Sequence, residues 1–329
     1  MSETLRLLGT SQAITHLRRQ IERVAPTPLP ILLRGETGTG KEVAARLIHQ
    51  ASGRTGPFIP IDCAALSPTL VESELFGHEK GSFTGANQRR EGLVHTAREG
   101  TFFLDEIGEL PMDVQTRLLR LLEQSTYRPV GAEYELKANI RIVAATWRDL
   151  AERVQESQFR RDLYHRLSVV EMVLPPLRDR AEDIEMLLLR FIEEAAAEMN
   201  RQTPTLHPQT HKYLLNWPWP GNVRELRNVA SYLCAMCSKP VVHLTDLPTH
   251  LRRDHPTTTS SSSNAPDLHL DLPYMEARRI WLNEFQVRYI EALLEAHNGN
   301  VSATARAAGM DRRSIQRIMT RNGLTSKRD

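Results

Sequence analysis

The strongest constraint on the fold of this chain is the glycine-rich string at residues 35–41. It reads Gly35-Glu36-Thr37-Gly38-Thr39-Gly40-Lys41. An apolar run precedes it at 31–33 and helix-forming residues follow it at 43–48, and the order of strand, glycine turn and helix is typical of a phosphate-binding loop. Backbone N–H groups converge there, the helix start adds partial positive charge, and Lys41 adds a full charge. The string therefore predicts a site for the β- and γ-phosphates of a nucleotide.

The residue after the lysine departs from the general phosphate-loop pattern. Glu42 stands where a Ser or Thr would bind Mg²⁺, so we expect a metal ligand elsewhere in the chain. Residues 100–106 offer one, because an apolar strand ends there in Asp105 and Glu106. Two acids at a strand end can be merely solvated, but downstream of a phosphate loop they favour catalysis. We expect Asp105 to bind Mg²⁺ and Glu106 to activate the attacking water.

Two further strands are expected to end near the same site. Residues 57–63 form a short strand that brings Asp62 to its end, and residues 142–146 form an apolar strand that ends in Thr146. Open parallel sheets place their ligands at the carboxyl ends of the strands. We therefore expect Asp62 at this edge of the sheet and Thr146 beside the γ-phosphate.

The order of these patterns predicts the domain organisation. A chain of 329 residues is long enough for two or three domains. We expect an α/β core at 1–175, built as a parallel sheet sandwiched by helices, and a small all-α unit at 176–253. A Ser- and Thr-rich linker at 254–272 then leads to a helical C-terminal domain at 273–329.

The loop at residues 72–86 allows two interpretations. It breaks a helical start with three glycines around Phe83 and Thr84. A phenylalanine in such a loop either contacts a partner or folds back onto the core of its own subunit. The spacing of the residues favours neither.

Three arginines are similarly open to two interpretations. Arg160 and Arg166 form part of a basic helical segment, which is either a solvated face or a source of guanidinium groups for the active site of a neighbouring subunit. Arg224 lies one turn into a later helix, from which it either reaches back to the nucleotide or caps acidic neighbours.

The C-terminal residues carry the pattern of a DNA-binding unit. From Asn300 onward there are seven Lys or Arg residues against two Asp, whereas the whole chain has a net charge of only +2. Residues 300–318 read as a helix, a turn at Gly309 and a second helix, which is the helix-turn-helix pattern. A solvated basic hairpin is the alternative. The residues expected at base edges or phosphates are Arg312, Arg313, Ser314, Gln316 and Arg317.

Composition excludes several other classes of protein. The N-terminus lacks the charged and apolar regions of a leader, and no apolar run reaches the length of a membrane span. We therefore expect a cytoplasmic protein that does not enter a membrane. Three cysteines are too few for a disulfide framework.

Together these strings resemble those of the sigma-54-dependent transcriptional activators, the bacterial enhancer-binding proteins of the AAA+ ATPase class. The resemblance covers about residues 7–250 and 275–325. The strings that carry it are GETGTGKE (35–42), ESELFGHEKGSFTGA (72–86), FFLDEIGELP (102–111), FRRDLYHRLSV (159–169), LPPLRDR (174–180), WPGNVRELRN (219–228) and the terminal Fis-type helix-turn-helix.

The resemblance implies a fold, two cofactors and several partners. It implies an AAA+ α/β core, an α-helical lid and a Fis-type helix-turn-helix domain, with ATP and Mg²⁺ as cofactors. Its partners would be the sigma-54 RNA polymerase holoenzyme, upstream enhancer DNA and further copies of the chain, as a hexameric ring when active and a dimer when inactive. A ring follows because each subunit would place an arginine in the ATP site of the next subunit. Such a head-to-tail interface forms a ring when the rotation between subunits closes.

The resemblance also assigns roles to single residues. Residues 81–86 match the GAFTGA loop that contacts sigma-54, so Phe83, Thr84 and Gly85 would contact that factor. Glu42 is the family's own variant of the phosphate loop. The other assignments are Thr146 as the first sensor, Arg224 as the second sensor, and Arg160 and Arg166 as fingers acting on the neighbouring subunit's ATP.

Three residues depart from the family pattern. Ser82 replaces an alanine of the loop, a change that we expect to be tolerated. Asp62 stands where the family has an asparagine that restrains the catalytic glutamate, and a carboxylate facing Glu106 would repel it. Trp147 replaces the asparagine after the sensor threonine. The departures at Asp62 and Trp147 predict altered coupling between the γ-phosphate and the loop.

Two rival functions and one regulatory hypothesis accompany this interpretation. The departures at Asp62 and Trp147 allow a DNA-binding regulator whose ATPase is degenerate, and the ATPase motifs alone also allow a AAA+ remodeller of another target.

Most family members carry a sensing domain before the ATPase, whereas this ATPase pattern begins within the first dozen residues. We therefore expect control in trans, by a separate regulatory protein or by expression level.

Overall fold

The computed structural model describes two compact units, one over Met1–His255 and one over Pro256–Asp329. In the first unit, the described residues are 6–65, 70–83, 86–237 and 239–252. In the second they are 286–287, 289–290, 292–294, 297, 300–311 and 315–319. No helix within these ranges is both long and apolar enough to span a membrane.

A five-stranded sheet forms the centre of the first unit. All of its pairings are parallel, as the sequence predicts. In spatial order its strands are β2 (Phe58–Asp62), β5 (Thr101–Asp105), β8 (Arg141–Thr146), β1 (Ile31–Arg34) and β9 (Val170–Val173).

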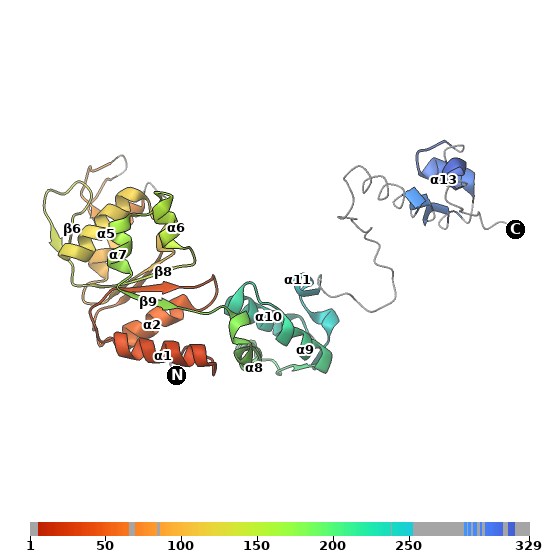
Figure 1. Cartoon of the computed structure of the whole chain (residues 1–329), viewed down its shortest axis with the longest axis horizontal. Coiled ribbons are helices and arrows are strands. Elements are labelled where there is room, and N and C mark those ends of the chain that lie inside the picture. Colours follow the sequence, from red (N-terminus) through yellow and green to blue (C-terminus); the bar gives the residue numbers. More distant parts are fainter. Residues whose placement is uncertain are drawn as a thin grey trace. The chain divides into compact units, whose positions relative to one another are not determined.

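Helices cover both faces of this sheet (Figure 1). One face packs against α1 (Gln12–Val24) and α2 (Lys41–Ala51). The other face packs against α3 (Val71–Phe76), α4 (Leu93–Thr96), α5 (Met112–Gln124), α6 (Leu150–Gln155) and α7 (Arg161–Leu167). The layers match the predicted α/β sandwich.

The apolar runs of the sequence become central strands because they must be buried on both faces. All six residues of β8 are buried. Successive side chains point to opposite faces of a strand, so Leu32 packs into the core beneath α3, α5 and α7, while Ile31 and Leu33 pack toward α1 and α2. The edge strand β9 is only partly buried.

Two short antiparallel ribbons project from the α/β layers. The first pairs β3 (Gly77–His78) with β4 (Arg90–Glu91), and the second pairs β6 (Thr126–Tyr127) with β7 (Leu136–Lys137). Hydrogen bonds between Val130 and residues 77 and 79 join the two ribbons.

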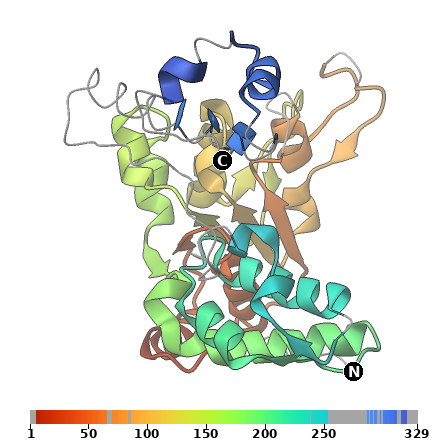
Figure 2. The same cartoon turned by 90° about the vertical axis from the view of Figure 1, so that its right-hand side faces the viewer.

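A helical subdomain follows the sheet within the same unit. Its core contains the fully buried Trp219, whose indole N–H donates to the carbonyl of Leu214 at 3.0 Å. Figure 2 shows its helices as one group in green to cyan. The helical elements are η2 (Leu177–Asp183), α8 (Ile184–Glu198), α9 (Pro208–Asn216), α10 (Asn222–Met236), η3 (Leu244–Asp246) and α11 (Thr249–Arg252), beside the strand pair β10 (Thr205–Leu206) and β11 (Val241–Val242).

The second unit contains the predicted helix and glycine turn. Helix α13 (Val301–Ala307) is capped by the Asn300 side chain, which accepts N–H groups from residues 302 and 303. Gly309 has a φ of 63°, the left-handed conformation that favours glycine. Residues 315–319 are again helical, and Ile315 packs with Ala305 in a small apolar cluster.

Candidate functional site: the carboxyl edge of the sheet

The phosphate loop joins the carboxyl end of β1 to the start of α2. The Gly35 N–H donates to the carbonyl of Thr146 at 3.2 Å, which ties the loop to the end of β8. Gly38 and Gly40 have φ values of 81° and 106°, where a side chain would be strained. Helix α2 begins at Lys41, so its free N–H groups face the loop.

Lys41 lies at the centre of this edge. Its side chain is buried, and Nζ donates to the carbonyl of Gly35 at 2.9 Å and to Oε1 of Glu106 at 3.3 Å. The sheet order explains the second contact, because only β8 separates the ends of β1 and β5. A cation and a carboxylate therefore meet where the sequence places the phosphates and the attacking water.

The two acids at the carboxyl end of β5 differ in backbone conformation. Asp105 ends the strand, and its Oδ1 accepts the N–H of Glu106 at 3.1 Å. Glu106 has a φ of 51°, an uncommon and strained value for a residue other than glycine. Burial raises the pKa of both carboxyl groups, while the charge of Lys41 acts to lower each pKa. Burial thus disfavours negative charge here, and a cation at this edge would offset that penalty.

Thr146 ends β8, the strand beside β5, and Trp147 comes directly after it. The Thr146 hydroxyl is buried and accepts the N–H of Arg148 at 3.0 Å. The Trp147 backbone N–H donates to Oε2 of Glu106 at 3.3 Å, while its side chain is 54% exposed. The structure therefore holds the Glu106 carboxylate between Lys41 and Trp147.

Asp62 lies at the same edge, but its carboxylate points elsewhere. Residues 62 and 105 are paired in the register of β2 and β5. The Oδ1 atom of Asp62 accepts the N–H of Ala64 at 2.9 Å, and within the described residues it forms neither a hydrogen bond nor an ion pair with Glu106. The nearby charge of Asp62 instead acts to raise the pKa of Asp105.

The helical subdomain closes over the phosphate loop. The carbonyl of Gly38 accepts N–H groups from Val223 at 3.0 Å and Arg224 at 3.3 Å. A Cβ on Gly38 would lie 2.4 Å from the carbonyl oxygen of Gly221, so this close approach requires glycine. Arg224 thereby lies beside the loop, with its side chain exposed.

Sequence reasoning missed the side chains that make this closure. Arg178 forms a bidentate ion pair with Glu36, with N···O distances of 2.5 and 2.9 Å, and this contact lowers the pKa of Glu36. The buried Asn222 donates to Glu36 at 3.1 Å and accepts the N–H of Leu177 at 2.7 Å. Both residues stand in the quoted strings LPPLRDR and WPGNVRELRN, but only the tertiary structure shows that they meet Glu36.

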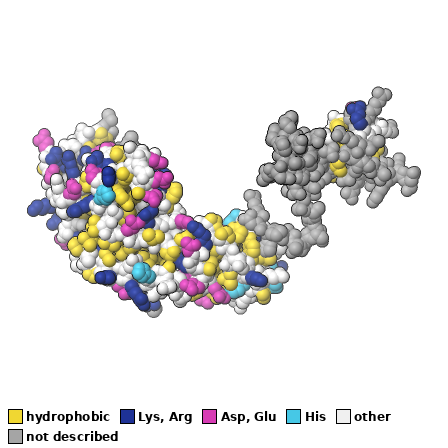
Figure 3. Space-filling view, in the orientation of Figure 1, with side chains coloured by type: hydrophobic (Ala, Val, Ile, Leu, Met, Phe, Trp, Pro, Cys, Tyr) yellow, Lys and Arg dark blue, Asp and Glu magenta, His cyan; other side chains and the backbone are white. Residues whose placement is uncertain are grey.

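Arg160 and Arg166 lie on another face of the unit, along α5. Arg160 precedes α7 and pairs with Asp162 at 2.6 Å, which raises the pKa of its guanidinium. Its backbone N–H donates to the side chain of Gln115 at 2.8 Å, and Arg166 donates to the carbonyl of Leu122 at 3.3 Å. Figure 3 shows basic and acidic side chains intermingled over the part of the unit that carries α5 to α7.

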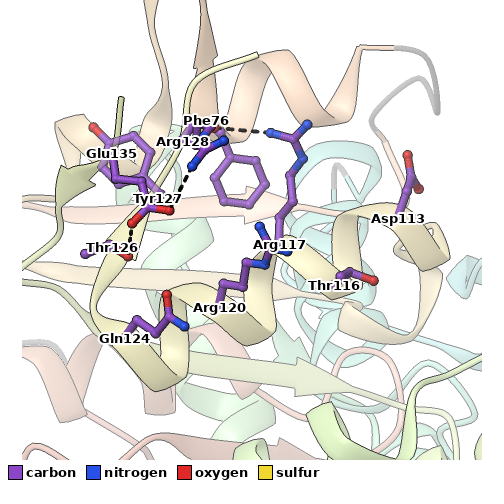
Figure 4. A pocket seen from close by; sticks show the side chains of 10 residues that line it. All are labelled: Phe76, Asp113, Thr116, Arg117, Arg120, Gln124, Thr126, Tyr127, Arg128 and Glu135. Atoms are coloured by element: carbon purple, nitrogen blue, oxygen red, sulfur yellow. Dashed lines mark hydrogen bonds and ion pairs between the residues drawn. The ribbon is translucent and has the colours of Figure 1, made fainter. Parts of the chain in front are cut away.

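A hollow of about 430 Å³ also borders α5. Arg117 and Arg120 extend from α5 in Figure 4, and Arg128 and Glu135 face them from the segment joining β6 to β7. Arg128 and Glu135 form an ion pair at 3.2 Å. The hollow therefore contains an ion pair between two of its own lining residues.

Phe83, in the glycine-rich loop, is partly exposed to solvent and partly packed against its own subunit. The ring is 37% exposed and packs edge-on against His78, with 5.0 Å between ring centroids. His78 is buried, and its Nδ1 forms a 2.7 Å hydrogen bond with the hydroxyl of Ser73. Thr84 and Gly85 lie outside the described residues.

The structure describes two of the five predicted DNA-contact residues. Gln316 and Arg317 are exposed on the helical segment 315–319, as a base- or phosphate-contacting helix requires. Arg312, Arg313 and Ser314 lie outside the described residues.

Replacing Lys41 with alanine is expected to lower the affinity for ATP by ~100-fold or more, because it removes a buried, charge-assisted donor from the phosphate site. Titration with a fluorescent ATP analogue measures this, and Lys212→Ala, at an exposed lysine of α9, is the matched control. Unchanged affinity in a folded Lys41→Ala protein would place the phosphates elsewhere.

Family models match the chain along most of its length. A sigma-54 interaction domain matches residues 7–173, a AAA+ ATPase lid domain matches 178–264, and the Fis family of bacterial regulatory proteins matches 282–327.

Individual relatives match over nearly the whole chain. Regulatory protein AtoC of Escherichia coli (strain K12) is 41% identical over 97% of this chain and 68% of its own length. The DNA-binding transcriptional regulator NtrC of the same strain is 41% identical over 98% of this chain and 70% of its own. Nitric oxide reductase transcription regulator NorR1 of Cupriavidus necator is 39% identical over 96% of this chain and 63% of its own.

Solved structures share the fold. The crystal structure of NtrX from Brucella abortus in complex with ADP is 34% identical and superposes with a TM-score of 0.74, covering 98% of this chain and 70% of that one. Its complex with ATP gives a TM-score of 0.73 at 34% identity, covering 97% and 69%.

Proposed function

The chain belongs to the sigma-54-dependent transcriptional activators, AAA+ ATPases with a Fis-type helix-turn-helix domain, and from this premise we infer how its residues divide the work. It binds and hydrolyses ATP, binds DNA, and activates transcription by sigma-54 RNA polymerase. The observation that carries the residue assignment is the convergence of Lys41, Asp105 and Glu106 at one edge of the sheet, with Lys41 Nζ 3.3 Å from Glu106.

At the nucleotide, the loop backbone at residues 35–41 and the Lys41 ammonium bind the β- and γ-phosphates. Asp105 holds Mg²⁺, which neutralises phosphate charge when bound. Glu106 orients the attacking water and accepts its proton, and Thr146 senses the γ-phosphate from the end of β8. Arg224 contacts the nucleotide from the helical subdomain, which the backbone contacts to Gly38 support.

Between protomers, Arg160 and Arg166 act on the ATP of the neighbouring subunit. Arg160 and Arg166 donate to residues of α5 rather than to their own phosphate loop. This position supports a role at the site of a neighbouring protomer, where a guanidinium would neutralise charge in the transition state. The active assembly is then a closed ring, in this family typically a hexamer, that forms from inactive dimers.

The loop around Phe83, Thr84 and Gly85 contacts sigma-54 and transmits the energy of hydrolysis to the closed promoter complex. The partial exposure of Phe83 and its contact with His78 support a side chain that leaves its own subunit without unfolding a core. The assembly acts in the cytoplasm.

The decisive experiment is promoter opening on a sigma-54 template. ATP should support open-complex formation and a non-hydrolysable analogue should not. A degenerate ATPase would bind DNA without opening the promoter. A remodeller of another target would hydrolyse ATP while Thr84→Ala left its sigma-54 binding, if any, unchanged.

The domain division 1–175, 176–253, 254–272 and 273–329 makes a further prediction. A chain shortened to residues 1–270 should retain ATPase activity and lose specific DNA binding, because the basic helical unit is removed. Within the full chain, Arg317→Ala should weaken DNA binding and lower its salt dependence by about one phosphate contact. Electrophoretic mobility shifts at several salt concentrations measure both effects, and specific binding by the shortened chain would contradict the division.

A further inference from the structure

The catalytic carboxylate of Glu106 is held at both of its oxygens. Oε1 accepts from Lys41 Nζ and Oε2 accepts from the Trp147 N–H, each at 3.3 Å. Since the proposed function gives the Lys41 ammonium to the phosphates, the Trp147 amide is the contact that remains to place the carboxylate toward water. On the β2 side, Asp62 bonds to Ala64, so within the described residues that side supplies no direct contact.

Arg148 fixes the segment that carries this amide. Its backbone N–H donates to the Thr146 hydroxyl at 3.0 Å, and its guanidinium carbon lies 4.9 Å from the centre of the Trp147 ring. Trp147 is 54% exposed, and a cation over the face of the indole favours this orientation of the ring. Arg148 therefore contacts Thr146 through its backbone and Trp147 through its side chain.

Arg148 also reaches the segment that follows Glu106. Its Nε lies 2.5 Å from Oε1 of Glu109, in the short helix η1 (Ile107–Glu109). Arg153 donates to the carbonyl of Gly108 at 2.7 Å in the same turn. The strained backbone of Glu106 is thus fixed on one side by β5 and on the other by a turn that two arginines hold to the β8 side of the site.

We propose that Arg148 is a positioning residue for Glu106, because it joins the end of β8, through Trp147, to the turn that begins directly after the glutamate. The side chain touches neither nucleotide nor water in this role; it sets where the Glu106 carboxylate lies during the reaction. The proposal rests on the function proposed for Glu106.

The test is Arg148→Ala beside Arg148→Lys, since lysine retains a cation for both Glu109 and the indole. Misplacement of a reacting group by about 1 Å costs up to ~100-fold in rate, so Arg148→Ala should lower kcat by about 10- to 100-fold. The affinity for an ATP analogue should not change, and Arg148→Lys should recover most of the rate. Arg190→Ala, which removes another ion-paired arginine on α8, is the matched control and should retain the full kcat.

A second readout needs no nucleotide. The fluorescence of Trp147 is obtained, in wild type and in Arg148→Ala alike, as the difference between each protein and its Trp147→Phe counterpart. Acrylamide should quench this fluorescence more strongly in Arg148→Ala, because the cation leaves one face of the ring. Wild-type kcat in Arg148→Ala, equal losses in the alanine and lysine variants, or a loss confined to nucleotide affinity would each overturn the proposal. If Glu106→Gln retained full turnover, the proposed function would fail with it; if Glu106→Gln were inactive while Arg148→Ala matched wild type, only this inference would fail.

Discussion

Arg160→Ala is expected to lower ATP turnover by ~10³-fold or more, the usual effect of removing an arginine finger. The nucleotide affinity of each protomer should remain, because Arg160 lies along α5 and bonds to Asp162 and Gln115 rather than to its own phosphate loop. Steady-state ATPase assays and titration with an ATP analogue separate the two quantities. The control is Arg161→Ala, at the adjacent exposed arginine, which lines a small surface hollow together with Arg160. This variant should change turnover far less.

Mixing variants tests whether this finger acts between protomers. An Arg160→Ala protomer retains an intact phosphate site, and a Lys41→Ala protomer retains an intact finger. Rings that contain both should regain part of the ATPase activity that neither variant has by itself. An Arg160→Ala protein whose turnover stays low at every mixing ratio would indicate that Arg160 acts within its own subunit.

Glu106→Gln is expected to reduce turnover by ~10²- to 10⁴-fold, the range for loss of a general base. Glutamine has nearly the same shape and can still meet the Trp147 amide, but it cannot accept a proton. ATP binding should persist, because Lys41 and the glycine loop are untouched. The measurement is single-turnover hydrolysis with saturating ATP, and Glu123→Gln, at an exposed acid of α5, serves as the control.

The same variant distinguishes the activator from a DNA-binding regulator with a degenerate ATPase. In an activator, Glu106→Gln binds ATP and DNA but does not open the promoter. In a binding-only protein, wild type and Glu106→Gln hydrolyse ATP at the same negligible rate. Equal rates therefore exclude the catalytic role of Glu106.

Much of the site could be predicted because its parts are local. A glycine loop between a strand and a helix is encoded in consecutive residues, and Gly38 and Gly40 have the φ values that such a loop requires. The sequence also predicts the acids at 105 and 106 at this edge, because strands that pair in parallel end on the same side of a sheet.

The contacts between these parts could not be predicted. Asp62 lies at the predicted edge of the sheet, but its carboxylate accepts the N–H of Ala64 rather than meeting Glu106. The hold on Glu106 by the Trp147 amide and the closure of Arg178 and Asn222 onto Glu36 gave no sequence signal of their own. Each depends on which strands are neighbours and on how two helical layers pack, and neither is encoded within one segment.

The sequence by itself determined the family, the α/β core with its helical lid, and the chemistry available at the nucleotide, because backbone requirements and strand ends are fixed by neighbouring residues. Only the tertiary structure decided which partner each charged group has. The order β2-β5-β8-β1-β9 brings Lys41 to Glu106 across 65 positions of the chain, and the packing of the lid brings Asn222 to Glu36 across 186. Such pairs form because the whole core is buried at once, a balance of many contacts that no short stretch of residues contains.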